Sequence, residues 1–110
     1  MAEPTVRVTE YTVSVLPEDD INASAYAVTV AYRGRGLWAV LLRSFCLGRD
    51  GEWDFEMLPS SREDEWLAEH RFTREEALEL AKAEAPHISV NGRTAAELLT
   101  VTYLGGESRG

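Results

Sequence analysis

Apolar and polar residues alternate through most of the first half of the chain, and this pattern predicts a β-sheet. The cleanest alternation is in AYAVTVAYR, residues 25–33, where every second side chain is apolar. Residues 5–16, TVRVTEYTVSVL, alternate as well, but their phase shifts near Thr9 and Glu10, as in a strand with a bulge. Residues 37–48, LWAVLLRSFCLG, are apolar on both faces. They are expected to form one central strand.

Two turn signals divide these segments into hairpins. The RGRG run at residues 33–36 supplies turn glycines, and Asp50-Gly51 is a frequent hairpin dipeptide. The second turn leads into a fourth strand, EWDFEM, at residues 52–57. Tight hairpins in succession predict an antiparallel meander.

The second half of the chain carries three helix-start signals of the S/T-x-x-E type. In this capping box the hydroxyl group accepts a hydrogen bond from an unpaired backbone N–H, and the glutamate returns one to the cap residue. The three pairs are Ser60 with Glu63, Thr73 with Glu76, and Thr94 with Glu97. They predict helices at about residues 61–70, at 74–85 and after Thr94. Whether residues 100–104 continue the last helix or return to the sheet is left open.

Together these elements predict a single α+β domain over residues 1–110, ordered from about 5 to 104, with a flexible tail at 105–110. Its four-stranded antiparallel meander sheet is expected to have two or three C-terminal helices packed on one face. The expected core consists of Tyr26, Val28, Val30, Trp38, Val40, Leu42, Trp53, Phe55, Trp66, Leu78 and Ala81.

Charge changes this picture because it is concentrated in one third of the chain. The formal net charge is −8. Residues 50–84 contain twelve acidic residues against four basic ones, so they carry the whole excess, and the remainder is neutral. Such a chain is a poor candidate for binding nucleic acid directly, because phosphates are normally neutralised by a basic face.

The stretch DGEWDFEM places an acid at every second position, namely at Asp50, Glu52, Asp54 and Glu56. On a strand these side chains would share one face at intervals of about 6.7 Å, with Trp53, Phe55 and Met57 turned into the core. A metal site or a carboxylate pair for acid/base work is the least favoured interpretation, because residues two apart on a flat strand diverge instead of converging on one ion. Two other interpretations stay open. The acids can be a solvated strand whose charge prevents edge-to-edge pairing, or a binding face for a basic partner.

The acids Glu63, Asp64 and Glu65 are possible neighbours of that face. Their place in the first turn of a predicted helix also suits the helix dipole. His70 and Glu69 lie at the end of the same helix and raise the alternative of a small enzyme or ligand-binding domain. The expected role of His70 is nevertheless structural, packing near Trp66 or binding a backbone carbonyl.

No other pattern points to catalysis, a metal or a cofactor. Cys46 lies between apolar residues and is expected to be inert packing, and His87 is expected in a loop. The glycines match no nucleotide-binding fingerprint, and no metal-ligand spacing occurs. A single cysteine fits a reducing compartment, and the chain has no apolar run long enough for a membrane span. A cytoplasmic protein is expected.

Several runs resemble a group of small uncharacterised proteins of actinobacteria and their phages. They are YRGRGLWAV, GEWDFE, EDEWLAEHRF, the Ala-rich segment ending in AP, and VNGRTA, within residues 11–99. Ten arginines against one lysine suit that origin. The resemblance implies no function, site residue or cofactor. A phage origin would imply the host cytoplasm.

The sequence therefore predicts a small acidic accessory or regulatory protein that binds a basic protein partner, which could itself be a nucleic-acid-binding protein. Its binding residues would be Asp50, Glu52, Asp54, Glu56, Glu63, Asp64 and Glu65. A phage-encoded inhibitor or nucleic-acid mimic is the most specific version. The alternatives are the enzyme with His70 and a structural subunit of an assembly, and a homodimer is left open.

Overall fold

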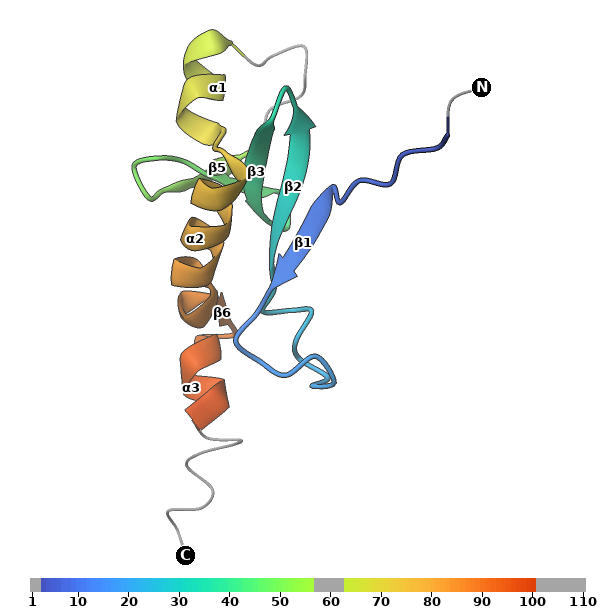
Figure 1. Cartoon of the computed structure of the whole chain (residues 1–110). Coiled ribbons are helices and arrows are strands. Elements are labelled where there is room, and N and C mark those ends of the chain that lie inside the picture. The colour runs from blue at the N-terminus through green and yellow to red at the C-terminus, as the bar shows by residue number, and fades with distance from the viewer. Residues whose placement is uncertain (1–2, 57–62, 101–110) are drawn as a thin grey trace, which may run out of the picture.

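The computed structural model describes residues 3–56 and 63–100 (Figure 1). The expectations for Met57, for Ser60, for residues 101–104 and for the tail fall outside these ranges.

The first half of the chain forms one antiparallel sheet in which every strand pairs with its neighbours in sequence. The strands are β1 (Glu10–Val13), β2 (Val28–Gly34), β3 (Leu37–Leu42), β4 (Phe45–Leu47) and β5 (Trp53–Phe55). Their order in the sheet is β1-β2-β3-β4-β5. The α+β class and the meander are thus confirmed, but the sheet has five strands where four were expected.

The extra strand arises because residues 37–48 do not form one continuous strand. The chain reverses at Arg43 and Ser44, so that Leu42 pairs with Phe45 and Leu41 with Cys46. Arg43 adopts a φ of 57°, a left-handed conformation that turns favour and most residues avoid. This turn contains neither Gly nor Asn at its bend, so the usual hairpin signal is missing.

The bulge expected near Thr9 and Glu10 was also wrong. The pairing of β1 with β2 is regular from Glu10 to Val13. The phase shift in the sequence marks the place where the chain joins the sheet, and residues 3–9 form an exposed arm before it (Figure 1). The register does shift at Tyr32 and Gly34, beside the first hairpin.

The helices follow in the second half as α1 (Asp64–His70), α2 (Arg74–Glu84) and α3 (Ala95–Leu99). Both capping boxes at Thr73 and Thr94 are present, with the hydroxyl and the glutamate each making its backbone bond. Helix α1 begins later than the predicted residue 61, with Glu63 as its N-cap and without a side-chain cap bond. Two of the three helix starts were therefore predicted for the correct reason.

The remaining short elements connect α2 to α3. A 3-10 turn, η2 (Ala85–His87), contains Pro86 and is followed by a small hairpin of β6 (Ser89–Val90) and β7 (Arg93–Thr94). The hydroxyl of Tyr26 donates to the carbonyl oxygen of Arg93 over 3.0 Å, which ties this hairpin to the start of β2. In the described part of the chain, no helix combines the length and apolar content needed to cross a bilayer.

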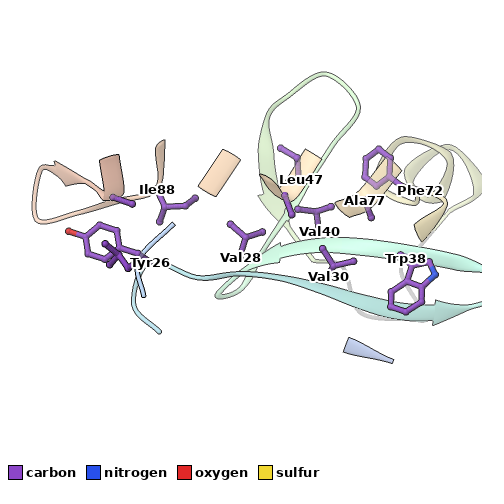
Figure 2. Close-up of a cluster of buried hydrophobic side chains, with 12 residues drawn as sticks. Tyr26, Val28, Val30, Trp38, Val40, Leu47, Phe72, Ala77 and Ile88 are labelled. Atoms are coloured by element: carbon purple, nitrogen blue, oxygen red, sulfur yellow. The ribbon is translucent and has the colours of Figure 1, made fainter. Parts of the chain in front are cut away.

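The core lies between α2 and the central strands. Ala77 and Ala81 are fully buried, and their small side chains let α2 lie close on β2 and β3. Figure 2 shows one layer of side chains that runs from Ile88 and Tyr26 to Phe72 and Trp38.

Most of the expected core is confirmed. Tyr26, Val28, Val30, Trp38, Val40 and Ala81 are buried, and Leu42, Trp53 and Leu78 are partly buried against them. Trp66 is half-buried beside His70. The assignment of Phe55 to the core was wrong, since this residue is 67% exposed.

The segment between α1 and α2 takes a place in the sheet. The pairing of β4 with β3 ends at Cys46, and nearer the start of β3 it is Phe72 that pairs with Trp38. The amide of Phe72 donates to the Trp38 carbonyl over 2.9 Å, and the Trp38 amide donates back over 2.7 Å. The Phe72 side chain is 1% exposed, so this bridge also fills the core.

Candidate functional site

The turn between β4 and β5 lies against the end of α1, and this contact brings the two acidic segments together. The amide of Asp50 donates to Oε1 of Glu69 over 3.0 Å. The amide of Arg49 donates to the Glu69 carbonyl oxygen over 2.9 Å. The strand acids and the helix acids, which are separate in sequence, therefore belong to neighbouring elements.

Arg49 fixes this contact with its side chain. Its Nε donates to the carbonyl oxygen of Ala68 over 2.9 Å, and its Nη2 to that of Arg71 over 2.8 Å. The guanidinium also lies 4.7 Å from the centre of the Phe72 ring. The last carbonyls of a helix lack partners within the helix and favour a positive charge. Arg49 therefore supplies donors at the end of α1, where Nη1 of Arg71 also donates to the His70 carbonyl oxygen over 2.9 Å.

Asp50, Glu52 and Asp54 are the exposed members of the strand series, and of these only Asp54 contacts His70. Oδ1 of Asp50 accepts a hydrogen bond from the Glu52 amide over 3.0 Å, so its carboxylate also shapes the turn. Glu52 is in the turn and precedes β5, which begins at Trp53. These two carboxylates remain available to solvent.

Asp54 lies opposite His70, with Oδ2 of the acid 3.0 Å from Nε2 of the ring. Nδ1 of His70 lies 2.8 Å from the Trp66 carbonyl oxygen, which can only accept a hydrogen bond. The ring is stacked on Trp66 at 4.3 Å between centroids, and the residue is 4% exposed.

This environment confirms the structural role expected of His70. It packs on Trp66 and binds a backbone carbonyl, and both of its ring nitrogens are already engaged. A general base needs a free nitrogen within reach of a substrate proton. The geometry therefore gives no support to an enzyme built on His70.

Glu56 is the most deeply engaged of the four acids. Its Oε1 accepts from Nη2 of Arg71 over 2.9 Å and its Oε2 from Nη2 of Arg33 over 3.0 Å. Arg71 is 4% exposed and lies with its guanidinium 5.1 Å from the Trp66 ring centre. A guanidinium so deeply buried requires a counter-charge. Glu56 is thus the internal partner of two arginines, and its carboxylate is not a free binding group.

The two arginines also determine how Glu56 titrates. Burial by itself raises the pKa of this carboxyl, but the hydrogen bonds and positive charges of Arg33 and Arg71 outweigh it. The net effect lowers the Glu56 pKa from its ordinary value of 4.5.

We expect acid to destabilise the fold through this group. A carboxyl whose pKa is lowered in the folded state stabilises the fold above its ordinary pKa, and that contribution disappears as the pH falls through the lower folded pKa. The free energy of unfolding should therefore fall below about pH 4.5. Urea unfolding from neutral to acidic pH measures it. The slope should be shallower in Glu56→Gln, and an equal slope in both proteins would contradict the assignment.

Phe55 lies on the other side of β5 from Asp54, facing solvent where the core was expected. Its ring stacks on Phe45 at 4.8 Å between centroids, and Phe45 is itself 36% exposed. The residues of DGEWDFEM thus alternate as predicted. On the aromatic side, however, Phe55 is exposed to solvent, and on the acidic side Asp54 and Glu56 already contact other side chains.

Cys46 behaves as buried packing, as expected. Burial, reinforced by the nearby charge of Glu56, raises the pKa of its thiol to about 11, although Arg71 and Arg33 act in the opposite direction. The residue is fully buried, and its Sγ atom lies 3.9 Å from the His70 carbonyl oxygen. A thiol that stays protonated at neutral pH is a poor nucleophile.

We expect Cys46 to be protected from thiol reagents in the folded protein. Modification by an aromatic disulfide reagent at neutral pH should be at least about a hundredfold slower than in the urea-unfolded chain, because the thiolate is scarce and covered. The release of the coloured thiol measures both rates. Similar rates would show that Cys46 is accessible.

The helix acids Glu63, Asp64 and Glu65 are all exposed. They occupy the cap and first turn of α1, which has only seven residues. His87 is exposed in η2, away from these acids in sequence. Within the described ranges, no group of three His, Cys, Asp or Glu side chains is arranged to hold a metal ion.

The residues that sequence reasoning missed are the arginines. Arg33, Arg49 and Arg71 organise the acids, yet each is separated from its partner by many residues. For Arg71 the available signal was the presence of only four bases among twelve acids in residues 50–84; Arg33 and Arg49 precede that segment, and their sequence neighbours gave no such signal.

Comparison of the chain with models of protein families, with curated proteins and with solved structures finds no match.

Proposed function

We propose that the protein is a small accessory or regulatory protein that binds a basic protein partner through an acidic surface. This proposal is carried by one observation, the contact between the Asp50 amide and the Glu69 side chain, which places the strand acids beside α1. A helix of seven residues is about 10 Å long. The exposed acids of both elements therefore lie within a distance that one partner can cover.

We call this set the acidic surface. It consists of Asp50, Glu52, Glu63, Asp64 and Glu65, all of which are exposed. Asp54 and Glu56, which the sequence also nominated, are left out because Asp54 already contacts the His70 ring and Glu56 already pairs with Arg33 and Arg71. The acidic surface is thus smaller than the sequence suggested.

Carboxylates gathered in this way favour association with a positively charged patch. Such charges mainly accelerate encounter and select against acidic partners, and their effect weakens as salt screens them. A partner that itself binds nucleic acid is the most specific form of the proposal. In that case the protein would compete with the nucleic acid for the basic face, as an inhibitor would.

Charge reversal at the acidic surface tests the proposal. The variant Glu52→Lys with Glu65→Lys is compared with the wild type and with Glu18→Lys and Asp19→Lys, which are exposed residues in the loop between β1 and β2. Both double variants change the net charge equally. Each is used to capture proteins from a lysate of the organism that encodes the chain, after thermal unfolding has shown that it folds.

The expected result is a partner bound by the wild type and by the loop variant but lost from the acidic-surface variant. Its binding should weaken as salt is added. Identical sets of captured proteins for all three would contradict the proposal.

A structural subunit is the second candidate, and the exposed Phe45 and Phe55 favour it. Stacked aromatic rings open to solvent on an edge strand are a common place for another chain to bind. If copies of the chain associate there, the molar mass measured by light scattering should rise with concentration. Phe55→Ser should then remain a monomer, and a constant mass in both proteins would contradict self-association.

A further inference from the structure

A groove lined by arginines, and so opposite in charge to the acidic surface, lies between the N-terminal arm, the sheet and the start of α2. Its volume is about 380 Å³, near the lower end of the range for ligand pockets. Its lining contains three aromatic residues, Tyr11, Tyr32 and Trp38, and two arginines, Arg7 and Arg74. None of the residues of the acidic surface lines it.

The aromatic residues form a fixed wall. The Tyr11 and Trp38 rings lie 5.6 Å apart between centroids, and those of Tyr32 and Trp38 lie 5.2 Å apart. The Tyr32 hydroxyl accepts a hydrogen bond from the Gly36 amide over 3.0 Å, which holds the ring against the first hairpin. A wall of contacting rings suits a planar or apolar side chain of a ligand.

The two arginines give the groove its charge. Arg7 makes no ion pair with any residue that the structure describes. Arg74 pairs with its neighbour Glu75 over 2.9 Å, but both side chains are more than half exposed. Exposed pairs of this kind are weak and are readily exchanged for another anion. The groove therefore favours an anionic ligand, although the chain as a whole is acidic.

The arm beside the groove offers unpaired backbone. Val6 is 95% exposed and Val8 59% exposed. The carbonyl oxygen of Thr9 accepts from the Tyr32 amide over 2.8 Å, and residues 3–8 make no main-chain hydrogen bond within the described part of the chain. In Figure 1 the arm runs away from the sheet as an extended trace. Extended backbone with free N–H and C=O groups can pair with another extended segment.

We propose that this groove binds an extended acidic segment of a partner protein, in which an aromatic side chain lies next to a carboxylate. The aromatic side chain would pack against Tyr11, Tyr32 and Trp38, and the carboxylate would bind Arg7 and Arg74. Pairing with the arm favours a peptide over a free small molecule. This site goes beyond the proposed function, because it takes an acidic ligand where the acidic surface takes a basic one.

Fluorescence anisotropy with labelled synthetic peptides tests the inference. The probe is a short peptide in which phenylalanine and aspartate alternate. One control peptide has lysine for every aspartate, and another has serine for every phenylalanine. The protein variant is Arg7→Glu with Arg74→Glu, matched in charge by Lys82→Glu with Arg93→Glu. An acid at the first position of a helix suits the dipole, so Arg74→Glu should fold.

The wild type and the Lys82→Glu, Arg93→Glu control should bind the acidic aromatic peptide, and binding to Arg7→Glu, Arg74→Glu should be at least about tenfold weaker, the loss of about 1.4 kcal/mol. Both control peptides should bind more weakly than the probe. Equal losses in both protein variants would show a general charge effect and would overturn the proposal. So would absence of binding to the wild type, or equal binding of the lysine peptide.

These outcomes are independent of the proposed function. The acidic-surface variant Glu52→Lys, Glu65→Lys should still bind the acidic aromatic peptide, since neither residue lines the groove. A failure of the groove would therefore leave the acidic surface untouched, and the reverse also holds.

Discussion

Phe72→Ala is expected to lower the free energy of unfolding by about 3–5 kcal/mol, the usual cost of removing a buried phenylalanine. The ring is the largest fully buried side chain in the described part of the chain, and its backbone pairs with Trp38 beside β3. The substitution leaves a cavity at the place where α1, α2 and the sheet meet. Urea unfolding followed by circular dichroism measures the change.

Phe55→Ala is the matched control for this prediction. The same atoms are removed, but the residue is 67% exposed and mainly contacts Phe45. Its effect should be about 1 kcal/mol or less. Equal effects of the two substitutions would show that the burial of one of these rings is misjudged.

Glu56→Gln is the second large effect we expect, a loss of about 3–5 kcal/mol, which is typical when one partner of a buried ion pair is removed. The glutamine keeps the shape of the side chain but leaves Arg71 buried without a counter-charge and facing Arg33. Chemical unfolding at neutral pH measures the loss.

The comparison variants separate charge from shape. Glu75→Gln removes the acid of an exposed pair with Arg74 and should change stability little. The double variant Glu56→Gln with Arg71→Met should recover part of the loss, because it removes the uncompensated buried charge as well. If the double variant is as unstable as the sum of its single variants, the ion pair is not the cause.

The features that were predicted correctly depend on neighbours in sequence. The capping boxes at Thr73 and Thr94 involve residues three apart, and the hairpin glycines act within their own turns. The meander followed from these turns. The correctly predicted helix starts and hairpins therefore depend on interactions between residues that are close in sequence.

The features that were missed depend on contacts between distant residues. The turn at Arg43 and Ser44 has no special residue at its bend, so nothing local announces it. The alternation around Phe55 correctly placed it on the same side of the strand as Trp53, but it could not show that the core ends between these two residues. An alternating pattern shows which residues share a face of the strand, but it does not show whether other residues cover that face.

The candidate site divides in the same way. The pattern located the acids of DGEWDFEM, but their roles come from Arg33, Arg71 and His70, which approach from other elements. Asp50 and Glu52 are exposed and contact none of these three side chains, whereas Asp54, which is also exposed, contacts His70.

The contacts of Arg49 also restrict how the chain can change in length. Surface loops ordinarily accept insertions, because their ends are free to move apart slightly. The turn after β4 is different, since the backbone and side chain of Arg49 bind two carbonyl oxygens of α1 and that of its C-cap residue Arg71, while Trp53 is fixed opposite Leu47. An added residue would displace one set of contacts or the other. The short hairpin at Gly34–Gly36 is tied down less firmly, so the two turns of this meander should tolerate insertion to different extents.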